Sequence, residues 1–216
     1  MNIQPYPLAA KQWLAEKTDK KWVVWHGTQG RTRETPANGK PGRATTSIDD
    51  WNSKPDRVGA PYLVDRDGTI YKTFDDSEWI YHLGLKGTDG KYDRAAVGIE
   101  IANELGLSRD GEKLHAFDFN TPNTVYTGRY LSQDWRDYHY FADFDEPQID
   151  ATIELTLDIC DRHKIKLHDL RLPPLLLGGG DHLSLQLPKG QDGSAAGGVG
   201  VGEDQGGGHR DRVVRG

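Results

Sequence analysis

His26 stands at the end of an apolar run, Val-Val-Trp-His at residues 23–26, and is followed by Gly27 and Thr28. A histidine at the end of a buried strand, with small residues beside it, is a common way to hold a metal ion over an open cleft. The next segment, residues 28–55, is a polar loop rich in glycine, proline and threonine, and loops of that length usually frame a site. This setting favours a metal ligand at His26 over the more common buried core histidine.

Three further runs each present one polar side chain that could take part in hydrolysis. Tyr62 opens a run that leads into an Asp-Gly turn, His82 follows Trp-Ile-Tyr, and Glu100 lies inside Val-Gly-Ile-Glu-Ile-Ala. A carboxylate can take and return protons, and a phenol can donate a hydrogen bond to a developing oxyanion. The residues alone leave two plainer alternatives open, which are a surface carboxylate at Glu100 and a core tyrosine at Tyr62.

Several other chemistries lack the residues that they need. The chain has no Gly-x-Ser-x-Gly sequence, and its one cysteine, Cys160, falls in a helical pattern that predicts burial, so a serine or cysteine hydrolase would lack its nucleophile. A single cysteine also excludes an internal disulfide. No phosphate-binding loop or dinucleotide fingerprint is present. The net charge of −6 and the pI of about 5.7 disfavour nucleic acid as a partner.

The elements that would position these side chains can be predicted from the apolar patterns. Residues 21–26 and 95–103 are typical of buried strands, and residues 60–74 of a hairpin around the Asp-Gly turn. Residues 7–16 show a short helical pattern. A second short helix is expected at residues 47–51, with its first serine as the cap.

In the second half of the chain, the sequence predicts an insertion followed by an amphipathic helix. Residues 106–145 are polar, aromatic-rich and irregular, which is typical of an insertion that decorates a cleft. Glu146 and Pro147 then open a helix that ends near residues 163–164. The apolar stripe predicted to face the core consists of Ile149, Ile153, Leu157 and Cys160.

Taken in order, the four runs resemble the zinc-dependent N-acetylmuramoyl-L-alanine amidases, the family of phage amidase-type lysozymes and peptidoglycan recognition proteins. The resemblance extends from Lys21 to about Lys189. It implies an α/β fold with a mixed central β-sheet flanked by helices, with zinc in a groove on one face. It also implies hydrolysis of the amide bond between N-acetylmuramic acid and L-alanine in peptidoglycan. We therefore expect one amidase-like domain at residues 1–189, which includes the insertion.

The resemblance further implies a set of zinc ligands. His26 matches the first ligand of the family. His182 is expected as the second, although this chain has Gly-Asp-His where the family usually has Gly-His, and His168 is its rival. The third ligand should be an aspartate, and Asp192 stands almost where it belongs. Two histidines and one carboxylate would leave a fourth zinc position open for water.

Catalytic and substrate-binding roles follow from the same resemblance. Glu100 would orient or deprotonate the attacking water, and Tyr62 would support the oxyanion. The residues expected to contact substrate are His82, Trp79 and Trp51.

Residues 190–216 form a glycine-rich tail without any aromatic residue, a composition that predicts disorder. A genuine linker and a shifted reading frame are both possible explanations, and we favour the frameshift. Back-translation from Lys189 as AAG GGG CAA GAC GGA TCC, read one nucleotide later after the first codon, gives Gly-Lys-Thr-Asp-Pro. This shifted sequence resembles the Lys-Thr-Asp-Pro-Gly motif that closes the family's site. In the present frame, Gln191 stands where the motif has its catalytic lysine.

The loss of this motif keeps other functions open. A chain without a complete zinc site could be a peptidoglycan-binding module without catalysis, and a zinc amidohydrolase acting on small peptides is a third option. We expect a monomer whose partner is peptidoglycan or muropeptides, without nucleic acid or membrane insertion. No signal peptide is recognisable, so we expect synthesis in the cytoplasm and release toward the cell wall by another route.

Overall fold

The computed structural model describes residues 1–29, 44–116, 125–135, 137–166 and 185–186, and the structural statements below concern these residues. His168, His182 and Asp192 lie outside these ranges, and so does the glycine-rich tail. None of the helices within the described ranges combines the length and the apolar character that crossing a membrane requires.

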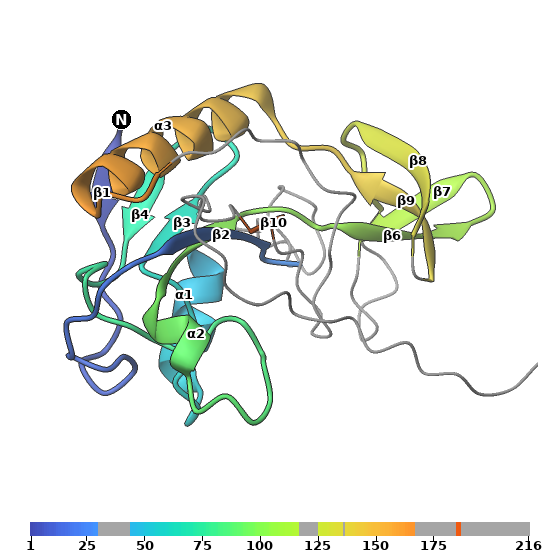
Figure 1. Cartoon of the computed structure of the whole chain (residues 1–216). Coiled ribbons are helices and arrows are strands. Elements are labelled where there is room, and N and C mark those ends of the chain that lie inside the picture. The colour runs from blue at the N-terminus through green and yellow to red at the C-terminus, as the bar shows by residue number, and fades with distance from the viewer. Residues whose placement is uncertain (30–43, 117–124, 136, 167–184, 187–216) are drawn as a thin grey trace, which may run out of the picture.

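A mixed six-stranded sheet forms the centre of the fold (Figure 1). Its strands in spatial order are β1 (Ile3–Pro5), β4 (Ile70–Lys72), β3 (Tyr62–Val64), β5 (Ala96–Ile101), β2 (Trp22–Gly27) and β10 (Leu185–Gln186). The β3–β4 and β2–β10 pairs are antiparallel, and the other pairs are parallel. The apolar strands β2 and β5 lie inside the sheet, as expected for strands whose two faces are both covered. The predicted strands and the hairpin are confirmed.

Helices cover the two faces of this sheet. The long helix α3 (Glu146–Arg162) lies across one face, where Leu155 and Ile159 pack against strand residues such as Ile99 (Figure 1). The shorter helix α1 (Thr45–Ser53) packs on the other face, where Ile48 meets Leu63. The predicted α/β fold, a mixed sheet flanked by helices, is therefore confirmed.

Two predictions in the N-terminal half were wrong, a helix at residues 7–16 and the cap of the helix at residues 47–51. Residues 7–16 contain turns and no helix, because this segment instead pairs with a distant one through a bridge between Leu14 and Trp79. The short helix around residues 47–51 exists as α1, but its cap is Ala44 and no side-chain hydrogen bond closes its first turn.

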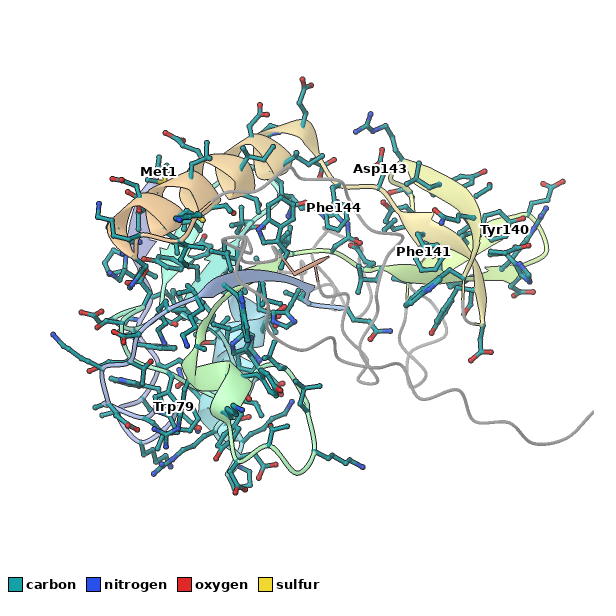
Figure 2. All side chains as sticks on the ribbon, viewed as in Figure 1. Met1, Trp79, Tyr140, Phe141, Asp143 and Phe144 are labelled. Carbon is teal, nitrogen blue, oxygen red and sulfur yellow. The ribbon has the colours of Figure 1, made fainter. Side chains whose placement is uncertain are left out.

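The described residues between 106 and 142 include the four strands of a second, antiparallel sheet, where an irregular segment was predicted. Its strands lie in the order β7 (Lys113–Ala116), β6 (Gly106–Asp110), β9 (Tyr138–Ala142) and β8 (Tyr130–Trp135), at the end of the molecule away from β1 (Figure 1). Tyr140 and Phe141, which Figure 2 labels, belong to β9. A small core of its own contains Leu107, Leu114, Ala116, Tyr126 and Ala142. β6, β7 and β9 contribute only one or two side chains each to this core and β8 contributes none, too few to give a clear alternation in the sequence.

The apolar stripe predicted to bury α3 faces outward. Ile149, Ile153 and Leu157 are 42%, 43% and 49% exposed, whereas the buried face of the helix includes Gln148 and Thr156. Hydrogen bonds offset part of the cost of burying these polar side chains. Gln148 Nε2 donates to the carbonyl of Ala102 at 2.8 Å, although its Oε1 has no partner among the described residues, and Thr156 Oγ1 donates to the carbonyl of Thr152 at 2.7 Å. The prediction for the stripe was wrong, and only its burial of Cys160 is confirmed.

A pair of substitutions on α3 distinguishes the observed orientation, with Gln148 buried, from the predicted one, with Ile153 buried. Gln148→Ala would remove the donor to a buried carbonyl, so we expect the free energy of unfolding to fall by about 1–3 kcal/mol. The matched control Ile153→Ala should change it little, because that side chain is half exposed and alanine is a better helix former. Chemical denaturation of both variants measures the difference. A larger loss at Ile153 than at Gln148 would contradict the observed orientation.

Candidate active site

The pairing of β2 with β5 places two of the predicted site residues next to each other. These strands are parallel, and His26 lies directly opposite Glu100 in their register. On the other side of β5, Glu100 lies opposite Leu63 of β3. Side chains in register share one face of a sheet, so His26 and Glu100 both lie on the face covered by α1. Their side chains are almost fully buried, with 1% and 5% exposed.

His82 joins this pair from a separate segment. Its Nδ1 lies 2.8 Å from Nε2 of His26, and the two rings meet edge to face. Gly98 of β5 provides the space, since a Cβ atom there would lie 3.0 Å from Nδ1 of His82. The structure therefore brings together His26, His82 and Glu100.

Asp93 holds the segment that carries His82, and the sequence reasoning missed it. This aspartate lies in α2 (Lys91–Arg94) and is 2% exposed. Its Oδ1 accepts hydrogen bonds from the backbone N–H groups of His82 and Leu83, at 2.8 and 2.9 Å. No spacing rule singles it out, because the bonds join it to the backbone of a segment about ten residues away. The one hint in the sequence is that Asp93 is an acidic residue shortly after Gly87 and Gly90.

Burial controls the charge of the site. It raises the pKa of Glu100 to about 8 and lowers the pKa of His82 to about 4. For His82, the charge of Asp93 opposes this effect and that of Lys20 adds to it. At neutral pH, in the absence of a cation, both side chains are therefore neutral.

The donor types fit a zinc ion. Neutral imidazole nitrogen and carboxylate oxygen are both common zinc ligands. Oε2 of Glu100 and Nε2 of His82 are buried without a hydrogen-bond partner among the described residues, as expected where a further group completes a site. A cation beside Glu100 would also favour its ionised form. Within the described ranges no three His, Cys, Asp or Glu side chains are grouped to hold a metal, so further ligands would have to come from the rest of the chain.

Tyr62 does not belong to this site. It lies in register with Ile99, so its ring faces α3 on the opposite side of the sheet from His26. Its hydroxyl donates to Asp76 Oδ2 at 3.1 Å and accepts from Arg162 at 3.3 Å. Burial and the charge of Asp76 raise the pKa of Tyr62 far above its usual range. The predicted catalytic role is therefore wrong, and Tyr62 is a core tyrosine.

The two aromatic residues predicted to contact substrate, Trp79 and Trp51, have different surroundings. Trp79 is only 3% exposed, its Nε1 donates to Glu16 at 3.0 Å, and the Arg94 guanidinium lies 4.2 Å from its ring centre. It is thus enclosed by its neighbours, and its contact with substrate stays a prediction. Trp51 of α1 is half buried and packs against Gly59. Its contact with substrate stays a prediction.

The remaining predicted ligands lie outside the described residues. These are His182, its rival His168, and Asp192. The described strand β10 begins three positions after His182, and its Leu185 pairs with Trp25, the residue before His26.

The metal-free protein should lose stability as the pH rises through the pKa of Glu100. The neutral form that burial favours is fully populated below the ordinary pKa near 4.5, and its stabilising effect is lost as the pH rises through about 8. We expect the free energy of unfolding to fall from pH 6.5 to about 8.5, and to fall less in Glu100→Gln, which has no titrating group there. Denaturant titrations of the metal-free proteins at several pH values measure these slopes.

The chosen pH range separates Glu100 from His82. Because the pKa of His82 is lowered from 6.5 to about 4, its effect is a loss of stability as the pH falls below 6.5. The exposed carboxylate variant Glu112→Gln is the control and should keep the slope of the wild type. Equal slopes for the wild type and Glu100→Gln would show that Glu100 is ionised in the folded protein.

Comparison with solved structures finds several amidases of low sequence identity. A mutant endolysin from Bacillus subtilis is 18% identical, over 77% of this chain and 80% of that chain, with a TM-score of 0.47. The catalytic domain of XlyA is 17% identical over the same shares, also with a TM-score of 0.47. The amidase AmiD from E. coli, in complex with anhydro-N-acetylmuramic acid-L-Ala-D-gamma-Glu-L-Lys, is 20% identical over 71% of this chain and 48% of that chain, with a TM-score of 0.43.

Sequence comparison gives the family directly. No curated protein matches the chain. The sequence model of the N-acetylmuramoyl-L-alanine amidases matches residues 16–182, which is well over half of the chain and includes His26, His82 and Glu100. The protein therefore belongs to the N-acetylmuramoyl-L-alanine amidases, a family of hydrolytic enzymes.

Proposed function

We propose that this chain is a zinc-dependent enzyme that hydrolyses the amide bond between N-acetylmuramic acid and L-alanine in peptidoglycan. The observation that carries the proposal is the position of Glu100. It is a buried carboxyl beside His26 on the next strand, and one of its oxygens has no partner among the residues that the structure describes. Such a group has little structural use but suits proton transfer. Membership of the amidase family supplies the substrate class.

His26, His182 and Asp192 are the zinc ligands that we propose. Support for His182 comes from β10, because Leu185 pairs with Trp25 and the three residue steps from His182 to Leu185 span at most about 11 Å when extended. When bound, zinc would activate water and polarise the scissile carbonyl. Asp192 is the weakest member, since it lies in a glycine-rich segment whose ordering costs conformational entropy.

The side chains of the chain itself would move the protons. Glu100 would accept a proton from the attacking water in its ionised form and return it to the leaving amine of L-alanine. A carboxyl that is protonated when the site is empty and ionised beside a cation can both accept and donate a proton near neutral pH. Nε2 of His82, which is buried without a partner in the described part of the chain, is the atom that we propose for the substrate contact.

A catalytically impaired wall-binding module is the second candidate. It is favoured by the absence, among the described residues, of any three side chains grouped as metal ligands. It is also favoured by Gln191, which cannot supply the positive charge of the family's catalytic lysine. Such a protein would retain muropeptides without cleaving them. The two experiments below separate the candidates.

Glu100→Gln should abolish most of the activity without loss of the metal. We expect kcat on purified muropeptides to fall by about 10²- to 10⁴-fold, because the proton acceptor is lost. Mass spectrometry of the released stem peptides measures the reaction, and metal analysis measures bound zinc. A chelator should remove the activity of the wild type, and added zinc should restore it.

The control for this variant is Glu112→Gln, an exposed carboxylate in the turn between β6 and β7, which should keep the activity of the wild type. Unchanged kcat in Glu100→Gln would contradict the proposed proton transfer. Muropeptide binding by a wild type that neither cleaves nor binds zinc would favour the wall-binding module.

The reading frame of the tail is tested by a gene that differs in one nucleotide. Removing one G at the Lys189–Gly190 junction would restore Gly-Lys-Thr-Asp-Pro, and we expect this protein to bind about one equivalent of zinc more tightly than the chain with the glycine-rich tail. It should also melt at a higher temperature, because each Val-Gly pair of the tail, back-translated as GTG GGA, gives Trp-Glu in the shifted frame, and these tryptophans can be buried. Calorimetry and chelator competition measure both differences. Equal melting temperatures and equal zinc affinities would show that the glycine-rich tail is genuine.

A further inference from the structure

We propose that Asp93 and His82 are positioning residues for His26. Asp93 fixes the segment that carries His82, and His82 in turn fixes the ring orientation and the tautomer of His26. A metal ion would then bind His26 through Nδ1. This inference rests on the proposed function, because it concerns the proposed zinc ligand.

The first contact in this chain of three residues is made by Asp93. Its Oδ1 accepts two backbone N–H groups, those of His82 and Leu83, at 2.8 and 2.9 Å. Hydrogen bonds to a carboxylate are stronger than those to a neutral acceptor, and a buried carboxylate loses much if they are removed. The helix that carries Asp93 is itself fixed by packing, since a Cβ atom at Gly90 would lie 2.7 Å from the ring of Trp79. The backbone at His82 is thus tied to a rigid part of the fold.

The second contact places the ring of His82. Gly98 of β5 leaves the space that this ring fills, and a Cβ atom there would lie 3.0 Å from Nδ1 and 3.3 Å from Cε1 of His82. With the backbone tied to Asp93 and the ring lying against β5, Nδ1 is directed at Nε2 of His26, 2.8 Å away.

The third contact selects the tautomer of His26. A neutral imidazole carries its proton on one nitrogen and a lone pair on the other. If His82 donated to Nε2 of His26, the proton of His26 would be on Nδ1, and neither nitrogen could bind a metal. If His26 donates from Nε2 instead, its Nδ1 carries the lone pair that a metal needs. Metal binding at His26 therefore requires that Nδ1 of His82 accept this hydrogen bond.

This arrangement is a known way to tune a ligand. Metal-binding histidines commonly donate their second ring N–H to an acceptor that fixes the ring, and loss of that acceptor typically weakens metal binding by about 10- to 100-fold. The usual acceptor is a carboxylate, a backbone carbonyl or water. Here the imidazole of His82 is the acceptor. The carboxylate of Asp93 contacts the backbone of His82 and not His26 itself.

Zinc affinity of the purified full chain, measured by competition with a fluorescent chelator, tests the proposal. We expect His82→Ala to raise the zinc Kd by about 10- to 100-fold, and Asp93→Ala to raise it by a smaller factor. Asp93→Asn is the conservative variant, and its amide oxygen can still accept both backbone N–H groups, so its Kd should stay close to that of the wild type. His139→Ala removes an exposed histidine of β9 and controls for the loss of an imidazole elsewhere.

Nitrogen-detected NMR of the histidine rings gives a readout that does not depend on activity. In the zinc-bound wild type, the proton of His26 should be on Nε2. In His82→Ala and Asp93→Ala, exchange of this proton should become faster, while the melting temperature reports any general loss of structure. An unchanged zinc Kd in His82→Ala, or a His26 proton on Nδ1 in the zinc-bound protein, would overturn the proposal.

If the wild type does not bind zinc, the proposed function is refuted. The positioning of His26 by Asp93 and His82 is then tested in the metal-free protein. There, Asp93→Ala must shift the ring nitrogen resonances of both His26 and His82, and Asp93→Asn must not. Unchanged resonances in folded Asp93→Ala would show that Asp93 does not position the two rings.

Discussion

The site depends on the parallel pairing of β2 with β5. Six residues of one strand lie in register with six of the other, from Trp22 opposite Ala96 to Gly27 opposite Ile101. Because side chains alternate between the faces of a sheet, this register decides which side chains share a face. A shift by one residue would move Glu100 to the α3 side and leave His26 facing an apolar residue. The large core on both faces of these strands fixes the register, so the relative position of His26 and Glu100 is set by packing.

The same alternation explains why the two faces have different chemistry. On the α3 side, the charged groups are paired, as in the contacts of Asp76 with Tyr62 and Arg162. On the α1 side, Glu100 and His82 keep buried polar atoms without a partner among the described residues. Unsatisfied buried atoms cost free energy, and a fold retains them where binding or catalysis requires them. Gln148 Oε1 on the α3 side also lacks a partner among the described residues, so the α1 side differs in that its unpartnered groups are titratable, a carboxyl and an imidazole.

Much of the fold could be predicted from the sequence, because the central strands carry long apolar runs. The Asp-Gly turn predicts the hairpin around Gly68, and the apolar runs around His26 and Glu100 predict the two strands that bring these side chains together. Periodicity failed at α3, where Gln148 and Thr156 are buried through hydrogen bonds that no apolar pattern can reveal. The role of Tyr62 was implied by the family resemblance, and only the register of β3 with β5 shows that its side chain lies on the α3 face, away from His26. Asp93 could not be found, since it acts on the backbone of another segment.

The inserted sheet ends in a strand that is open to solvent. β8 is the last strand in the order β7-β6-β9-β8, and Tyr130 and Leu131 within it are 51% and 52% exposed. An open edge of this kind offers backbone N–H and C=O groups to a strand of a second molecule, which can lead to aggregation. The regular pairing of β8 with β9 is interrupted between Ser132 and Trp135, and Asp134 adds a charge at that point. This irregularity limits the regular edge to three residues, which is too short to start the growth of an intermolecular sheet.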